Sequence, residues 1–288
     1  MAVQRIDERF AALKREGRAG LITFVTAGDP NSEQSLSLIC ALPDAGADLI
    51  EIGMPFSDPM ADGPSIQAAS LRSLRAGMTL QKTLDLVSAF RKTDQITPII
   101  LMGYFNPIAS YGTERFASAA VTAGADGCII VDLPPEEEQA LKPFADRAGL
   151  AIIRLVAPTT DDARLARVIA GTSGFVYFIS ITGVTGTKSF AAAEIEPHIA
   201  RLKRSSALPI AVGFGIKTPT RAAEVARIAD AVVVGSAIVE TIALRLDARA
   251  AGADLQGAVI SFVRSLAVAV RGARSRTASS RARRSMKR

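Results

Sequence analysis

Short, continuously apolar runs recur along the chain, and between them apolar residues return every three or four positions. Runs of this length that are apolar on both faces are typical of parallel strands covered on both sides. The three-to-four-residue spacing is typical of helices with one buried face. Eight strands are predicted, at residues 21–26, 48–52, 98–102, 127–131, 150–156, 175–180, 209–212 and 230–234.

The regular alternation of these runs predicts an α/β fold. Eight strands, each followed by a helical stretch, favour a closed (β/α)8 TIM barrel over a doubly wound sheet. Residues 3–14 have one apolar face and are expected to cover the bottom of the barrel as an extra N-terminal helix. No change in composition divides the chain before residue 271, so we expect one catalytic domain over residues 1–271.

Three residues indicate where helices end. Gly46 and Gly124 each precede an Ala-Asp pair and the next predicted strand, and glycine there can close a helix in the left-handed conformation. Pro43 interrupts the pattern of the first barrel helix. We expect that helix to end or kink at Pro43, because proline has no amide hydrogen to donate.

Length and charge separate the expected barrel from a tail. The 288 residues are 49% hydrophobic, which suits a barrel of roughly 250 residues with extras. The net charge is +6, but residues 272–288 contain seven Lys or Arg and no acid, so the rest of the chain has a net charge of −1. This Arg-rich tail lacks large aliphatic residues other than Met286 and is predicted to be disordered and solvated. Attraction of nucleic acid by its charge is the alternative.

The residue inventory excludes several kinds of site. His198 is the only histidine, which excludes a Ser/His/Asp triad and histidine-based metal centres, and we expect no metal. Cys40 and Cys128 both lie in apolar runs, which argues against a disulfide framework and fits a reducing cytoplasm. Residues 1–20 lack the apolar core of a secretion signal, and no apolar run reaches the roughly 18 residues of a membrane span. We expect a cytoplasmic protein whose chemistry depends on carboxylates.

Three carboxylates lie where a barrel places its active site, at the carboxyl ends of strands. Glu51 is near the end of the second strand, on the face of Leu49, and an acid there is expected to be partly desolvated with a raised pKa. The structural alternative is a glutamate paired with a buried cation. Asp58 and Asp62 share the next loop, which its prolines restrict. Spacing alone does not decide between the two aspartates, and loop acids are often merely solvated.

Three glycine-bearing loops follow the sixth, seventh and eighth strands. They contain Gly186, Gly213 with Gly215, and Gly235 with Ser236. Glycine lets backbone N–H groups approach an anion, and Ser236 is expected to open a helix whose N-terminus favours negative charge. Glycines also serve plain turns, but loops at these positions are where phosphate-binding barrels hold a phosphate. We therefore predict a phosphate site here.

Several ordered motifs together resemble the tryptophan synthase alpha subunit family. They are FVTAGDP at 24–30, LIEIGMPFSDPMADGP at 49–64, MGYFNP at 102–107, VDLP at 131–134, GVTG at 183–186 and GSAIV at 235–239. The resemblance implies a TIM-barrel lyase that cleaves indole-3-glycerol phosphate to indole and glyceraldehyde 3-phosphate by a retro-aldol reaction. Ile181 departs from the pattern, since some members have arginine there, and the resemblance does not extend to the tail.

The resemblance also implies roles for individual residues. Glu51 would handle the proton at indole C3 and the proton of the side-chain hydroxyl, while Asp62 would accept a hydrogen bond from the ring N–H. Phe24 would line the indole pocket, and Tyr177 would lie beside the reacting carbon. Tyr104 is a further substrate-binding candidate. Without the resemblance, aromatic residues in strands are more often core than ligand contacts.

A partner is implied as well. Family members act with a beta subunit that binds pyridoxal phosphate and receives indole, in an alpha2-beta2 heterotetramer, and the alpha chain itself is expected to need no cofactor. A loop around Thr185 would close over the substrate. The residues expected to face the partner are Pro55, Phe56, Asp58, Asn106 and Asp132.

Two other functions are alternatives for this sequence. A different phosphate-binding barrel, such as an isomerase or another synthase, would share the glycine loops but not the pair Glu51 and Asp62. A non-catalytic scaffold with a nucleic-acid-binding tail would show salt-sensitive affinity that depends on residues 272–288.

Overall fold

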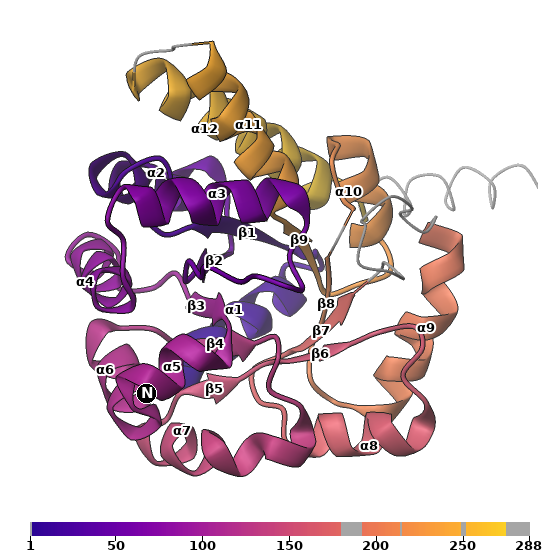
Figure 1. Cartoon of the computed structure of the whole chain (residues 1–288). Coiled ribbons are helices and arrows are strands. Elements are labelled where there is room, and N and C mark those ends of the chain that lie inside the picture. The colour runs from indigo at the N-terminus through magenta and orange to yellow at the C-terminus, as the bar shows by residue number, and fades with distance from the viewer. Residues whose placement is uncertain (1, 180–191, 214, 249–251, 275–288) are drawn as a thin grey trace, which may run out of the picture.

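The computed structural model describes residues 2–179, 192–213, 215–248 and 252–274. Its strands are all paired in parallel within one sheet, in the order β5-β4-β3-β2-β1-β9-β8-β7-β6, which curls into a nearly closed barrel (Figure 1). The strands are β1 (Gly20–Thr26), β2 (Leu49–Gly53), β3 (Ile99–Gly103), β4 (Gly127–Ile130), β5 (Ala151–Ile152), β6 (Arg154–Val156), β7 (Val176–Ile179), β8 (Ile210–Gly213) and β9 (Ala231–Val234). The predicted TIM barrel is confirmed.

One predicted strand is divided. Residues 150–156 form the two short strands β5 and β6, because the chain changes its pairing partner at Ile153. Ile152 pairs with Cys128 of β4, whereas Arg154 pairs with Val176 of β7. The two edges of the sheet thus meet through a single continuous segment, and this closes the barrel.

Helices surround the strands (Figure 1). They are α1 (Ala2–Arg15), α2 (Ser32–Ala45), α3 (Pro64–Arg75), α4 (Leu80–Arg91), α5 (Phe105–Tyr111), α6 (Thr113–Ala123), the 3-10 helix η1 (Pro135–Ala140), α7 (Lys142–Ala148), α8 (Asp162–Ala170), α9 (Ala192–Ser205), α10 (Pro219–Ala226), α11 (Ser236–Asp247) and α12 (Gly252–Arg271). Gly46 and Gly124 follow α2 and α6 with φ of 105° and 99°, which confirms the predicted left-handed helix ends. Pro43 does not end α2, since the helix continues to Ala45.

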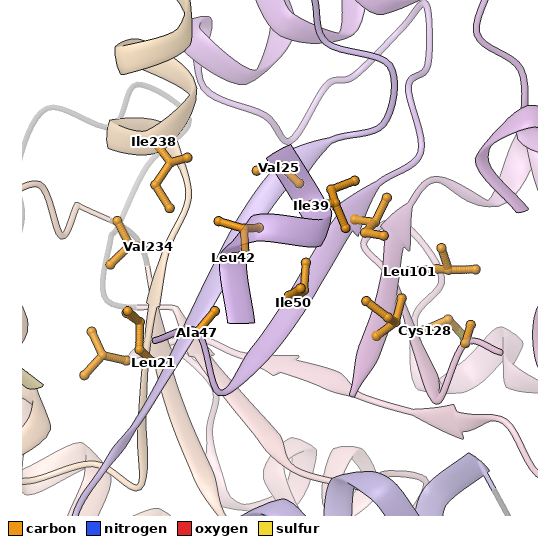
Figure 2. Packing of buried hydrophobic residues seen from close by; sticks show 14 of the residues in the cluster. Leu21, Val25, Ile39, Leu42, Ala47, Ile50, Leu101, Cys128, Val234 and Ile238 are labelled. Carbon is orange, nitrogen blue, oxygen red and sulfur yellow. The ribbon is translucent and has the colours of Figure 1, made fainter. Parts of the chain in front are cut away.

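Side chains alternate between two cores, as the strand period requires. One cluster lies between the sheet and the outer helices. Figure 2 shows part of it, with Leu42 of α2 near Leu21 of β1 and Ile50 of β2. The other fills the barrel and includes Ile22 and Leu49. The second cluster also contains Ile6, Phe10 and Leu13 of α1, so α1 covers one end of the barrel as predicted.

Buried carboxylates mark that same end of the strands. Asp48 accepts a hydrogen bond from the amide of Leu21 at 2.8 Å, and Asp126 accepts one from the amide of Ile99 at 2.8 Å. Arg5 of α1 forms an ion pair with Asp126 at 2.7 Å, which attaches the covering helix to the barrel. The covered end contains the amino ends of the strands, so the carboxyl ends are left for a site.

The predicted boundary at residue 271 falls at the end of α12. The next three residues still lie against the barrel, because Ala273 is buried and Arg274 donates to the carbonyl oxygens of Ala226 and Ala229 at 3.0 and 2.6 Å. Residues 275–288 of the predicted tail lie outside the described residues. In the described part of the chain, none of the helices has the length and apolarity to cross a membrane.

Candidate active site

Glu51 is a buried acid inside the barrel. It lies in β2 beside Phe24 of β1 and Ile100 of β3, and its exposed fraction is 0%. Within the described residues, neither of its carboxylate oxygens has a hydrogen-bond partner. Burial raises the pKa of Glu51 to about 8. The side chain is therefore a protonated acid at neutral pH, and no cation among the described residues pairs with it.

Two predicted aromatic residues lie inside the barrel with Glu51. Tyr177 of β7 is 3% exposed, and burial raises the pKa of its hydroxyl well above the usual range. The charge that Glu51 carries once it has ionised, above about pH 8, raises the pKa of Tyr177 further. Phe24 is 8% exposed, and a Cβ atom at Gly53 would lie 2.6 Å from its ring. A Cβ atom at Gly213 would collide with the hydroxyl of Tyr177. These glycines thus make room for the two rings.

Asp62 lies in the loop between β2 and α3, next to Tyr104. Burial raises the pKa of Asp62 to about 6, against the lowering effect of a hydrogen bond from the Tyr104 hydroxyl. The same hydroxyl accepts a hydrogen bond from the amide of Ala61 at 3.0 Å, so Tyr104 holds two consecutive residues of the loop. Asp58 is exposed, and among the described residues its carboxylate accepts a hydrogen bond only from its neighbour Ser57. Geometry thus separates the two aspartates that spacing left equivalent.

The glycine-bearing segments that are described lie at the carboxyl ends of two adjacent strands, β8 and β9. Gly213 ends β8, and Gly215 has a φ of 75°, a conformation that favours glycine. Gly235 precedes α11 and Ser236 begins it, and within the described part of the chain this helix has no side-chain cap. An uncapped helix N-terminus presents amide groups to an anion. Gly186 and Thr185 lie outside the described residues.

The predicted partner-facing residues lie at the same end of the barrel. Pro55, Phe56 and Asp58 follow β2, Asn106 lies in α5 after β3, and Asp132 follows β4. The amide of Phe105 donates to Asp132 at 2.8 Å. Asp58, Asn106 and Asp132 are exposed, and the ring of Phe56 lies 5.4 Å from that of Tyr104. This surface therefore adjoins the Asp62 loop directly.

Sequence reasoning missed the contacts that hold α3, the helix after the Asp62 loop. Arg72 forms an ion pair with the buried Asp29 of the β1–α2 loop, and Ser73 donates to the carbonyl oxygen of Ala27. The motif that contains Asp29 marked that residue, but nothing in the pattern identified Arg72 as its partner.

Metal chemistry finds no support in the described segments, where no three His, Cys, Asp or Glu side chains come together as metal ligands. Cys40 and Cys128 are free thiols, as their positions in the sequence suggested.

Comparison with known proteins shows the family of this chain. A family model described as tryptophan synthase alpha chain matches residues 10–267. A tryptophan synthase alpha chain of Caulobacter vibrioides is 61% identical over 242 residues, which are 84% of this chain and 88% of the relative. That of Granulibacter bethesdensis is 57% identical over 272 residues, 94% and 98% of the two chains.

Solved structures show the same relationship. The alpha subunit from Legionella pneumophila superposes with a TM-score of 0.86 at 41% identity, covering 92% of this chain and 98% of that one. A tryptophan synthase structure from Mycobacterium tuberculosis gives 0.83 at 35% identity, covering 93% and 98%. The resemblance seen in the motifs is confirmed, and the chain belongs to the tryptophan synthase alpha chain family.

Proposed function

We propose that this chain cleaves indole-3-glycerol phosphate to indole and glyceraldehyde 3-phosphate, with Glu51 and Asp62 as its catalytic residues. The observation that carries the proposal is the state of Glu51, which is fully buried, lacks a partner among the described residues and has a pKa of about 8. A carboxylic acid that keeps its proton at neutral pH is what protonation of a weakly basic ring carbon requires.

The reaction breaks the bond between indole C3 and the first carbon of the side chain. Glu51 gives its proton to C3, which leaves positive charge on the ring nitrogen and makes Glu51 a carboxylate. That carboxylate then takes the proton of the side-chain hydroxyl. The hydroxyl oxygen becomes the aldehyde oxygen, the carbon–carbon bond breaks, and its electron pair returns to the ring to give neutral indole. Each general acid or base step of this kind contributes on the order of 10²–10⁴ in rate.

Asp62 suits the other end of the ring. Its pKa of about 6 leaves it ionised at pH 7, where Glu51, with a pKa of about 8, is protonated. An ionised Asp62 accepts a hydrogen bond from the indole N–H and stabilises the positive charge that forms on nitrogen. Two carboxylates with separated pKa values thereby take opposite roles in one reaction.

The phosphate of the substrate would bind at the glycine-bearing segments after β8 and β9. The amides near Gly215 and at the start of α11, at Gly235 and Ser236, provide donors without a side-chain cap. Holding the phosphate fixes the indole ring between the two acids, and positioning of this kind accounts for much of an enzymatic rate. Phe24, Tyr104 and Tyr177 would form the walls of the indole pocket.

We also propose that indole passes to a beta subunit that binds pyridoxal phosphate, in an alpha2-beta2 heterotetramer located in the cytoplasm. The support is family membership together with the exposed surface formed by Asp58, Asn106 and Asp132 beside the Asp62 loop. The free thiols Cys40 and Cys128 are compatible with a reducing compartment.

The function is tested by incubating the purified chain with indole-3-glycerol phosphate and measuring both products. We expect indole and glyceraldehyde 3-phosphate in equal amounts, formed slowly by the chain alone and faster with a beta subunit. Absence of indole under both conditions would exclude this function.

A further inference from the structure

Glu240, in the second turn of α11, binds side chains from two other segments. Its Oε1 atom accepts a hydrogen bond from Ser65 Oγ at 2.9 Å and another from Lys217 Nζ at 2.8 Å. Partial burial raises the pKa of Glu240, but the bonds from Lys217 and Ser65 outweigh this and hold it below the usual value. Glu240 is thus an anion at neutral pH that receives two donors on one oxygen.

The three residues belong to the segments that the proposed site uses. Ser65 is three residues after Asp62, in the first turn of α3. Lys217 is two residues after Gly215, and Glu240 is four residues after Ser236. The bridge of Ser65, Glu240 and Lys217 therefore joins the loop of one proposed catalytic acid to both described phosphate-binding segments.

The backbone alone does not make this connection. In the sheet, β2 is separated from β9 and β8 by β1, so no strand pairing joins the end of β2 to the ends of β8 and β9. The link is made above the sheet, where α3 packs against α11. The hydrogen bond from Ser65 to Glu240 is a polar part of that link, and Arg72 near the other end of α3 also interacts electrostatically with Asp247 of α11.

The other end of α3 is attached elsewhere. Arg72 and Ser73 bind Asp29 and the carbonyl oxygen of Ala27, both in the β1–α2 loop. That attachment does not involve the phosphate-binding segments, whereas Glu240 joins the start of α3 to them by hydrogen bonds between described side chains. The side chains of Lys217 and Glu240 are 57% and 36% exposed, and an ion pair so exposed breaks and re-forms readily.

We propose that Glu240 is a positioning residue that couples occupancy of the phosphate site to the placement of Asp62. The inference rests on the function proposed above. Bound phosphate fixes the segment of Gly215 and the start of α11, and this favours the arrangement in which Glu240 holds both Lys217 and Ser65. With Ser65 held, the loop end that carries Asp62 is held as well. The binding energy of the phosphate, which does not itself react, thereby helps to hold Asp62 in the position that the chemical step requires.

The test divides the substrate into two pieces. Indoleglycerol, which lacks the phosphate, is given to the enzyme with and without phosphite dianion, and indole release is measured. In the native chain, phosphite fills the phosphate site and accelerates cleavage of indoleglycerol. In Glu240→Ala, we expect the acceleration by phosphite to fall at least about fivefold, since one charge-assisted hydrogen bond of partial exposure is lost. In Glu240→Gln, we expect an acceleration by phosphite between those of the native chain and Glu240→Ala, because the amide oxygen of glutamine can still accept a hydrogen bond from Ser65.

A matched control is available on the neighbouring helix α10. Glu224 forms an ion pair with Arg221 at 2.9 Å within that one helix, so among the described residues its side chain does not join separate segments. Glu224→Ala is expected to keep the native response to phosphite. With intact indole-3-glycerol phosphate, Glu240→Ala is expected to lower kcat about fivefold and to change KM less than about twofold, whereas loss of a simple phosphate ligand would raise KM.

The outcomes separate this inference from the proposed function. Equal activation of Glu240→Ala and the native chain by phosphite would overturn the coupling, and so would a native chain that cleaves indole-3-glycerol phosphate but shows no response to phosphite with indoleglycerol. Failure of the proposed function has a different signature, which is no indole from intact indole-3-glycerol phosphate. Thermal unfolding of each variant establishes that it is folded before rates are compared.

Discussion

Arg72 donates two hydrogen bonds, each 2.8 Å long, from Nε and Nη2 to the two carboxylate oxygens of Asp29. Asp29 is 1% exposed, so its charge depends on this partner. Burial raises the pKa of Asp29, and the bonds from Arg72 oppose that increase. A bidentate pair of this kind fixes both partners in orientation as well as distance. It anchors α3, and with it the far end of the Asp62 loop, to the loop that follows β1.

Replacing Arg72 should therefore cost stability. In Arg72→Met the carboxylate of Asp29 stays buried without its partner, and we expect the free energy of unfolding to fall by about 3 kcal/mol. Urea unfolding at pH 7 measures the change. Arg147→Met is the control, because its pair with Glu114 is 62% and 73% exposed and its loss should have almost no effect. Equal effects of the two substitutions would contradict the role given to Arg72.

Glu51 should lower the stability of the fold as pH rises. The raised pKa of about 8, against 4.5 for an ordinary glutamate, means that the folded state retains a proton that the unfolded state releases. Stability is therefore unaffected below pH 4.5 and decreases as pH rises from there to about 8. Glu51→Gln has no carboxyl group to titrate, so it should be the more stable chain, by roughly 4 kcal/mol at pH 8 and by about 1 kcal/mol at pH 5. Denaturant unfolding at the two pH values provides the comparison, and a difference independent of pH would mean that Glu51 is not buried as described.

Much of this architecture could be predicted from the sequence, because buried parallel strands and left-handed helix ends are local patterns. The runs around Glu51 and the glycines Gly46 and Gly124 needed no knowledge of distant residues. The pairing change at Ile153 could not be predicted, since it depends on which strands meet when the barrel closes. The continuation of α2 past Pro43 is also a tertiary effect, because packing of the helix against the sheet offsets one lost hydrogen bond.

The site, too, could be predicted from the sequence only in part. Glu51 was identified by its place in a strand, whereas the choice between Asp58 and Asp62 required the position of Tyr104, 42 residues beyond Asp62. At Gly213 the structure adds a second reason for glycine that the sequence pattern did not provide. The pattern indicated a phosphate loop, and the structure adds that a side chain at this position would collide with Tyr177.

The plot of kcat/KM against pH should fall on both sides of an optimum, with an acidic limb set by Asp62 and an alkaline limb set by Glu51. Below about pH 6, Asp62 takes up a proton and no longer accepts a bond from the indole N–H, and above about pH 8 Glu51 loses the proton that C3 requires. We expect kcat/KM to be greatest between these values. Asp62→Asn should have a lower kcat/KM, and its pH profile should lack the acidic limb. An acidic limb that persisted in Asp62→Asn would exclude Asp62 as its source.

Tyr104 should set the position of the acidic limb. Its hydroxyl bond lowers the pKa of Asp62, so Tyr104→Phe should raise that pKa and shift the limb to higher pH, by up to about one unit. The pH profile of kcat/KM measures the shift. Tyr111→Phe loses only a bond to Gln81 on the surface and should leave the profile unchanged. A downward shift in Tyr104→Phe would contradict the geometry.

Substitution of Glu51 tests the central claim most directly. Glu51→Gln keeps the shape of the side chain but cannot deliver a proton to indole C3. Turnover of indole-3-glycerol phosphate should fall at least about 10³-fold. Calorimetric titration, carried out on the same preparation, should show the substrate still binding within a few fold of the native affinity. Loss of turnover with retained binding is the predicted result, and substantial indole release by Glu51→Gln would contradict the account.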